Sequence, residues 1–197
     1  MSLSAHFFVF NLIILELTIF NENGVIEIVG NIILVLCLLR CLQYSLKSHI
    51  KQGHYFWIAA ILVFFIVIRR ELNYLADVFI PSGFSIWSHS YDWWEDSVLL
   101  LIYIITAGLL IYSWRYFWVL LKDTAIALYI IVAALALLQY MGENAIGFSP
   151  EIGVAVEELS ENIIYTIALL YLLSFDLSDF EGRLSNRQGF ELEAHNS

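Results

Sequence analysis

The sequence predicts an all-α membrane protein: a bundle of six transmembrane helices with both termini on the cytoplasmic side. Three observations support this fold class. Of the 197 residues, 60% are hydrophobic and only 14% are charged, and the mean hydropathy is +0.78. Long apolar runs recur along the chain, so there is too little polar surface for a soluble globule. Seven of the nine Lys and Arg residues fall on one side of the predicted membrane, which the positive-inside rule assigns to the cytoplasm.

Six apolar segments approach the length that a hydrocarbon layer of about 30 Å requires. They comprise residues 5–19, 25–46, 55–75, 98–121, 124–141 and 154–175. The first segment is the shortest and carries Glu16. It could instead lie at the membrane surface, which would leave five spans.

The basic residues orient these segments. Arg69 and Arg70, toward the outer end of the third segment, are the two exceptions to the inside bias, so we expect acids to hold them there. Aromatic residues gather at both ends of the fourth segment and are typical of interfacial belts. Residues 79–96 contain Pro81 and Gly83 and predict a turn followed by a short amphipathic stretch on the membrane surface.

The organisation is predicted to be a transmembrane domain over residues 1–176 and a cytoplasmic, partly disordered tail over 177–197, because the tail has mixed charges and no evident apolar periodicity. The start of the chain lacks the basic region of a secretory signal, so we expect the first segment to be retained. Cys37 and Cys41 lie one helical turn apart in an apolar run and are interpreted as packing residues. The expected location is a bacterial inner membrane.

Acidic side chains within the apolar segments are the main functional signal, since a carboxylate in hydrocarbon needs a proton, a cation or a hydrogen-bond donor. Counting about 1.5 Å per residue from the inner end of each segment places acids of four or five helices at a similar depth in the outer third of the membrane. Glu143 falls at the outer boundary. The others at depth are Glu16, Glu27, Glu71, Glu157, Glu158 and Glu161.

Helical spacing brings the three acids of the last segment together. Glu157 and Glu158 precede Glu161 by four and three residues, so all three can point the same way, with Asn162 beside them. Asn73 belongs to a second polar stripe that begins at Arg69. Such side chains face a bundle interior because lipid offers them no partners.

Six acids at depth face only two bases, Arg69 and Arg70, so ion pairs alone leave negative charge uncompensated. Some acids could be protonated, or a cation could be bound. A set of carboxylate and amide oxygens suits a hard divalent ion such as calcium, magnesium or manganese. The candidate metal ligands are Glu71, Glu143, Glu157, Glu158, Glu161 and His89, supported by Glu16, Glu27, Arg69, Arg70, Asn73 and Asn162.

His89 stands on the outer side and could fold over the site, in which case zinc would also be a suitable ion. The simpler interpretation of His89 is a solvated loop histidine, and that of the Arg and Glu set is an ion-pair network that fixes helix register. The sequence has no paired histidines at mid-membrane depth, which a haem would need as ligands. It also has no glycine loop of the kind that binds the phosphates of a nucleotide.

The predicted function is therefore binding of a cation or metal at an acidic intramembrane site, as a sensor or transport component. Two alternatives remain open. One is a membrane enzyme that uses a metal or a carboxylate pair on a lipid or lipid-linked head group, so enzymatic activity is undecided. The other is an accessory or assembly subunit. The expected partners are the lipid bilayer and either a membrane protein or a second copy of the chain. A nucleic acid is not expected, because the net charge is −10.

Overall fold

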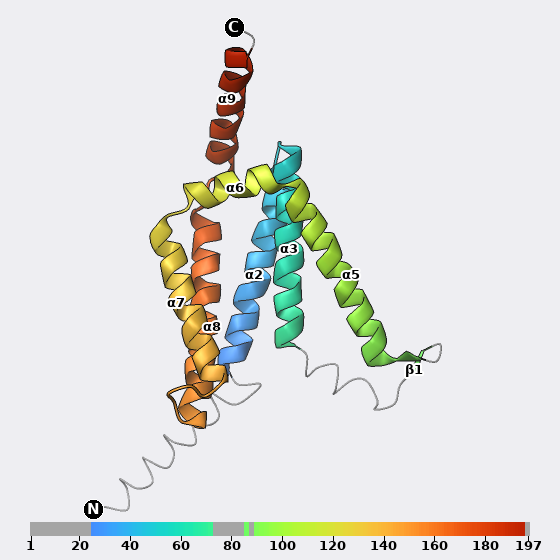
Figure 1. Cartoon of the computed structure of the whole chain (residues 1–197), viewed down its shortest axis with the longest axis vertical. Helices are drawn as coiled ribbons and strands as arrows, with labels where there is room; N and C mark the ends of the chain where they lie inside the picture. Colours follow the sequence, from blue (N-terminus) through green and yellow to red (C-terminus); the bar gives the residue numbers. More distant parts are fainter. Residues whose placement is uncertain (1–24, 73–84, 87–88, 196–197) are drawn as a thin grey trace, which may run out of the picture. The chain divides into compact units, whose positions relative to one another are not determined.

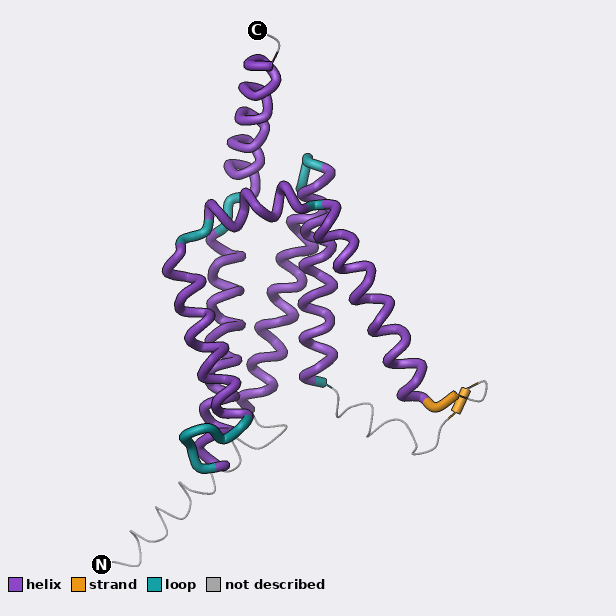
Figure 2. Tube along the Cα trace, viewed as in Figure 1, coloured by secondary structure: helices purple, strands orange, loops and turns teal. Residues whose placement is uncertain are grey.

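A computed structural model describes residues 25–72, 85–86 and 89–195, and nearly all of them are helical (Figures 1 and 2). The strands are two residues long and pair antiparallel, with Ser85 opposite Ser90. In chain order the elements are α2 (Val25–Lys47), α3 (Lys51–Glu71), β1 (Ser85–Ile86), β2 (His89–Ser90), α5 (Tyr91–Tyr112), α6 (Trp114–Asp123), α7 (Ile126–Glu143), α8 (Pro150–Ser174) and α9 (Leu177–His195).

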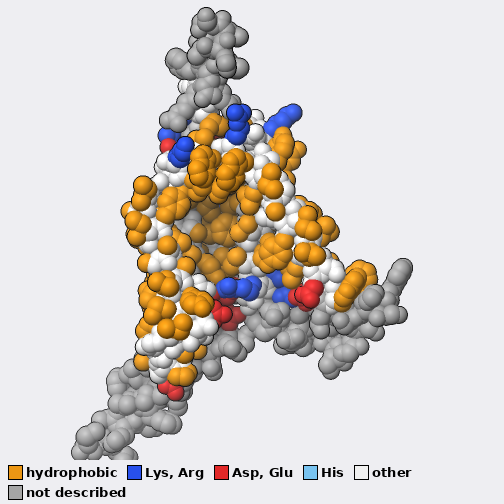
Figure 3. Space-filling view, viewed as in Figure 1, with side chains coloured by type: hydrophobic (Ala, Val, Ile, Leu, Met, Phe, Trp, Pro, Cys, Tyr) orange, Lys and Arg blue, Asp and Glu red, His pale blue; other side chains and the backbone are white. Residues whose placement is uncertain are grey.

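Four of the described helices are long and apolar enough to cross a membrane: Ile26–Lys47, Lys51–Glu71, Trp93–Tyr112 and Ile126–Glu143. A fifth span is obtained if α8 and the first part of α9 count as one helix bent by 65°. The chain is thus consistent with an integral membrane protein, and apolar side chains dominate the face seen in Figure 3. The predicted first span lies outside the described residues. The count of six and the orientation therefore stay predictions.

The chain divides into two compact units. Unit 1 comprises Met1–Leu34 and Ala125–Leu169, and unit 2 comprises Val35–Thr124 and Leu170–Ser197. The boundaries fall within α2 and α8 and between α6 and α7, so α2 and α8 contribute to both units.

In unit 1, α7 and α8 form a close helical hairpin (Figure 1). The connection after α7 uses two residues with positive φ, Ala145 at 49° and Gly147 at 79°. Gly142 and Gly153 bring the two backbones together: a Cβ added to Gly142 would lie 2.6 Å from the carbonyl oxygen of Gly153. Only glycine permits an approach this close.

In unit 2, buried aromatic side chains join four helices at the end of the unit where α6 lies. The Trp57 ring packs 4.7 Å from Tyr44, and its indole N–H donates a 3.2 Å hydrogen bond to the hydroxyl of Tyr116. Tyr116 also contacts Phe180 of α9, with ring centroids 5.3 Å apart. Burial raises the pKa of the Tyr116 phenol, because removal from water disfavours the charged form.

The predicted fourth span, residues 98–121, is two helices in the structure. α5 ends at Tyr112 and α6 begins at Trp114, and Figure 1 shows α6 running across the ends of α3 and α5. Ser113 at the break is buried and its hydroxyl donates a 2.6 Å bond to the carbonyl oxygen of Leu109, one turn earlier in α5. α6 is amphipathic: Tyr116 is buried whereas Trp118 is exposed. This pattern suits a helix lying at a membrane surface.

The expected disordered tail is helical from Leu177 to His195. The side chains of Leu177, Phe180 and Leu184 are buried, and their spacing of three and four residues is that of one helix face. This periodicity is present in the sequence, where charged residues and a glycine separate the apolar positions.

The predicted surface stretch of residues 79–96 lies partly outside the described residues. Its last part forms the short strands and the beginning of α5, which starts at Tyr91. Trp93 and Trp94, with ring centroids 5.1 Å apart, therefore lie in the first turn of a membrane-length helix.

Candidate intramembrane polar site

The acids of α8 lie on a helix that packs against α7 in unit 1. Glu161 is buried, with only 7% of its surface exposed, whereas Glu157 and Glu158 are half-buried. These residues are close on the helix because three or four residues make about one turn. Glu161 is thus the carboxyl group most fully removed from solvent in the first half of α8.

Gln139 of α7 provides the hydrogen-bond donor for this carboxyl group. Its side-chain amide donates to Oε1 of Glu161. The rest of α7 carries almost no polar side chain until Glu143 at its end. The glycine contact between α7 and α8 holds the two helices close enough for this bond between side chains.

Asn162 extends the polar set toward α2. Its side-chain amide nitrogen donates a 3.0 Å bond to the backbone oxygen of Glu158. Its oxygen faces Gly30, where an added Cβ would lie 3.0 Å away. The side-chain oxygens of Asn162 and of Asn31 are both buried and accept no hydrogen bond from any residue that the structure describes.

We refer to Gln139, Glu158, Glu161 and Asn162, together with Asn31, which follows the Gly30 that Asn162 faces, as the polar cluster. It combines a buried carboxyl group with two buried amide oxygens that accept no hydrogen bond from any described residue. Buried acceptors of this kind are costly unless they find a donor or a cation. Chemically, the cluster can accept a proton or a hard cation.

Two other predicted acids of unit 1 lie near helix ends. Glu27 is half-buried in the first turn of α2, where the helix dipole favours a negative charge. Glu143 is exposed at the last residue of α7. That these two acids share one ligand set with Glu161 stays a prediction.

The two arginines predicted to balance the acids have carboxylate partners in unit 2. Arg69 forms an ion pair with Glu95 of α5. Arg70 contacts its neighbour Glu71, with 2.8 Å between Nη2 and Oε1. These pairs occupy the end of α3 and the beginning of α5, which pack together in the same unit.

Three predicted residues cannot be placed. Glu16 and Asn73 lie outside the described residues, and for His89 only the backbone is described, within β2. Within the part of the chain that the structure describes, no group of three or more His, Cys, Asp or Glu residues is arranged to hold a metal ion. The described residues therefore give no support to the predicted ligand set, which comprised Glu71, Glu143, Glu157, Glu158, Glu161 and His89.

The sequence prediction missed two residues that take part in these contacts. Gln139 is a single amide in an apolar helix, and such an amide needs a partner in another helix. That rule could have singled it out. Glu95 falls within the predicted surface stretch of residues 79–96, because the fourth span was expected to begin only at residue 98.

Comparisons with protein-family models, curated proteins and solved structures give no match. The site is therefore interpreted from its own residues alone.

Proposed function

We propose that this protein is a small integral membrane protein that binds a proton or a cation at the polar cluster, as a sensor or a transport component. The single observation that carries the proposal is the buried carboxyl group of Glu161, which accepts a hydrogen bond from Gln139, on a helix whose Asn162 has a side-chain oxygen that, like that of Asn31, accepts no bond from the described residues.

The charge balance of the cluster supports this function. Gln139 supplies a neutral donor to Glu161, and a carboxylate buried in an apolar environment is stabilised when a proton or a cation removes its charge. A bound cation would neutralise the carboxylate and could also be coordinated by an amide oxygen. A proton on Glu161 would remove the charge and supply one further donor.

The chemistry of the donors sets which ions are expected. Carboxylate and amide oxygens without a thiolate favour hard ions such as sodium, calcium, magnesium or manganese over soft ones. Zinc would need a nitrogen or sulfur ligand for its usual tetrahedral site.

Elemental analysis and thermal unfolding of the detergent-purified chain test the proposal. After chelator treatment, each of the hard ions and zinc is added at fixed pH, and the unfolding midpoint is then followed across pH without added ion. We expect either one cation or a lower pH to raise the midpoint of the native chain, and Glu161→Gln to abolish that response.

Glu151→Gln is the matched control, because it removes the same charge from an exposed position in the first turn of α8. It should retain the response of the native chain. The proposal fails if neither cations nor pH distinguish the native chain from Glu161→Gln. A cation response lost in Glu161→Gln identifies ion binding, and a pH response without a cation response identifies protonation.

A further inference from the structure

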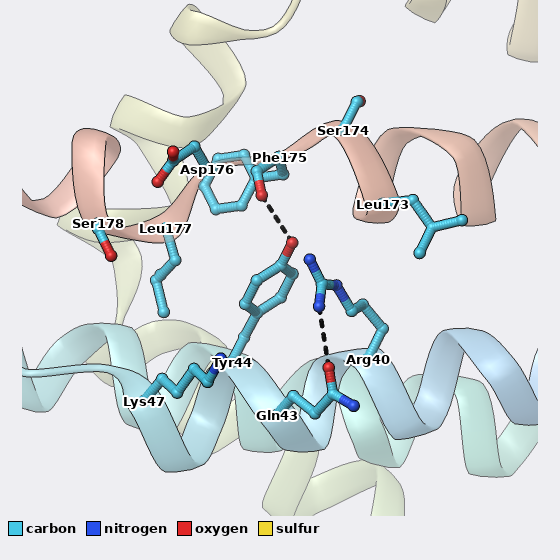
Figure 4. A pocket seen from close by; sticks show the side chains of 10 residues that line it. All are labelled: Arg40, Gln43, Tyr44, Lys47, Leu173, Ser174, Phe175, Asp176, Leu177 and Ser178. Carbon is cyan, nitrogen blue, oxygen red and sulfur yellow. Dashed lines mark hydrogen bonds between the residues drawn. The ribbon is translucent and has the colours of Figure 1, made fainter.

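A cavity of about 340 Å³ lies in unit 2, between the last turns of α2 and the segment that joins α8 to α9 (Figure 4). The lining residues from α2 include Arg40, Gln43 and Lys47. Those from the end of α8, the joining segment and the start of α9 include Ser174, Asp176 and Ser178. Its volume is at the lower end of the range for sites that bind small molecules.

The two basic residues of this cavity form no ion pair with any described acid. Neither Arg40 nor Lys47 has a carboxylate oxygen within 4.0 Å among the residues that the structure describes. This is unexpected in a chain with a net charge of −10, and it contrasts with Arg69, Arg70 and Arg183, which all have acidic partners.

The guanidinium group of Arg40 is held at the cavity by its neighbours. It lies 4.7 Å from the centre of the Tyr44 ring and donates a 2.9 Å bond to the side-chain oxygen of Gln43. A weaker bond of 3.4 Å runs from Nε to the backbone oxygen of Leu172. Because a guanidinium group has five N–H donors, this arrangement leaves donors for a ligand.

Asp176, the acid in the cavity wall, has a local role. Its Oδ1 accepts a 3.0 Å bond from the backbone N–H of Asp179 in the first turn of α9. The positive end of the α9 dipole also offsets this charge. The lining therefore remains favourable for an anion.

Tyr44 contacts backbone carbonyl oxygens that would otherwise repel an anion. Its hydroxyl contacts the backbone oxygens of Leu172 and Phe175, at 2.7 Å for Phe175, where α8 ends (Figure 4). The carbonyl groups at a helix end carry partial negative charge. Contacts from Tyr44 and Arg40 offset this partial charge at two of the carbonyl oxygens, those of Leu172 and Phe175.

The position of the cavity along α2 indicates which kind of molecule carries the anionic group. Lys47 is the last residue of a membrane-length helix, and Arg40 lies about 10 Å deeper along the helix axis. Long basic side chains near the end of a span extend toward the lipid head groups. We propose that this cavity binds a phosphate group, carried by a phospholipid of the leaflet that meets this end of α2.

The test measures the apparent Kd from the shift in thermal unfolding of the full-length chain in detergent. The probes are phosphatidylglycerol, inorganic phosphate and diacylglycerol, which lacks phosphate. We expect phosphatidylglycerol to stabilise the chain. Lys47→Ala and Arg40→Gln should each raise the apparent Kd for this lipid about fivefold. Any shift that diacylglycerol causes should be the same in the native chain, Lys47→Ala and Arg40→Gln.

Lys51→Ala is the matched control, because Lys51 is an exposed base at the start of α3 and does not line the cavity. It should leave the apparent Kd unchanged. If only inorganic phosphate gives a shift that Lys47→Ala weakens, the cavity binds phosphate from a soluble ligand. Equal effects of Lys47→Ala and Lys51→Ala, or no shift with either phosphate probe, would overturn the proposal.

Discussion

The side-chain amide of Gln139 on α7 donates a hydrogen bond to the buried carboxyl group of Glu161 on α8. Both residues belong to unit 1, and the backbones of the two helices meet one turn further along α7, at Gly142. A donor and an acceptor that are removed from water together depend on each other, since neither has an alternative partner in lipid.

Gln139→Leu should therefore destabilise the chain, because it leaves the carboxyl group of Glu161 without this donor. We expect a loss of about 1–2 kcal/mol in the free energy of unfolding, the range for buried polar groups in membrane helices. Reversible unfolding in mixed micelles would measure it.

The double variant Gln139→Leu with Glu161→Leu separates this loss from a change in packing. Removing both polar partners should restore much of the stability that Gln139→Leu alone loses. Strictly additive losses from the two substitutions would show that the bond contributes nothing to stability.

Gly142→Ala should destabilise the α7–α8 hairpin, because the added methyl group would lie 2.6 Å from the Gly153 carbonyl oxygen and 2.8 Å from the Glu157 backbone nitrogen. Backbone atoms cannot move aside as the end of a side chain can, so we expect a cost of about 1–3 kcal/mol. Thermal unfolding in detergent would measure it.

Gly108→Ala is the control for that substitution. Gly108 lies within α5, and an added Cβ there meets no atom within 4 Å. Alanine should be neutral or should raise stability by up to about 1 kcal/mol, since it favours the helix more than glycine does. Equal effects at the two glycines would contradict the close backbone contact.

The spanning helices could largely be predicted from the sequence, because long apolar runs determine them. Residues 25–46 and 124–141 correspond closely to α2 and α7. The break at Ser113 could not be found in this way. Residues on both sides of it are apolar or aromatic, and only their contacts in unit 2 show that α6 turns its Tyr116 face inward.

For the candidate site, the sequence pointed to the acids of α8 but not to Gln139. The spacing of Glu158 and Glu161 indicated one helix face, and the structure describes Glu161 as buried. The donor, Gln139, comes from a helix that carries no charge before Glu143, so charge counting could not reveal it. The pairing of Arg69 with Glu95 depended on where α5 begins, which helix length alone does not determine.

Glu181→Ala should loosen the attachment of α9 within unit 2. The buried carboxylate of Glu181 accepts a 3.0 Å bond from the backbone N–H of His49 and a 2.5 Å bond from the hydroxyl of Ser48, in the turn between α2 and α3. We expect a loss of about 1–3 kcal/mol and faster proteolytic cleavage within α9. Limited proteolysis followed by mass spectrometry would measure the cleavage rate.

Asp179→Ala is suited as the control, because Asp179 is an exposed acid on the same helix whose side chain contacts only Arg183 of α9 in the described residues. It should change the cleavage rate little, since exposed ion pairs contribute little stability. If both variants were cleaved at the same rate, Glu181 would not be what attaches α9 to the turn.

Infrared spectroscopy of the carboxyl groups tests the central claim most directly, because it detects whether Glu161 changes its protonation or ligation. Difference spectra of the native chain, with and without the stabilising cation or across pH, should contain a carboxyl band that is absent in Glu161→Gln and present in Glu151→Gln. If the difference spectra of the native chain and Glu161→Gln are identical, Glu161 binds neither proton nor cation, and the proposed function is wrong.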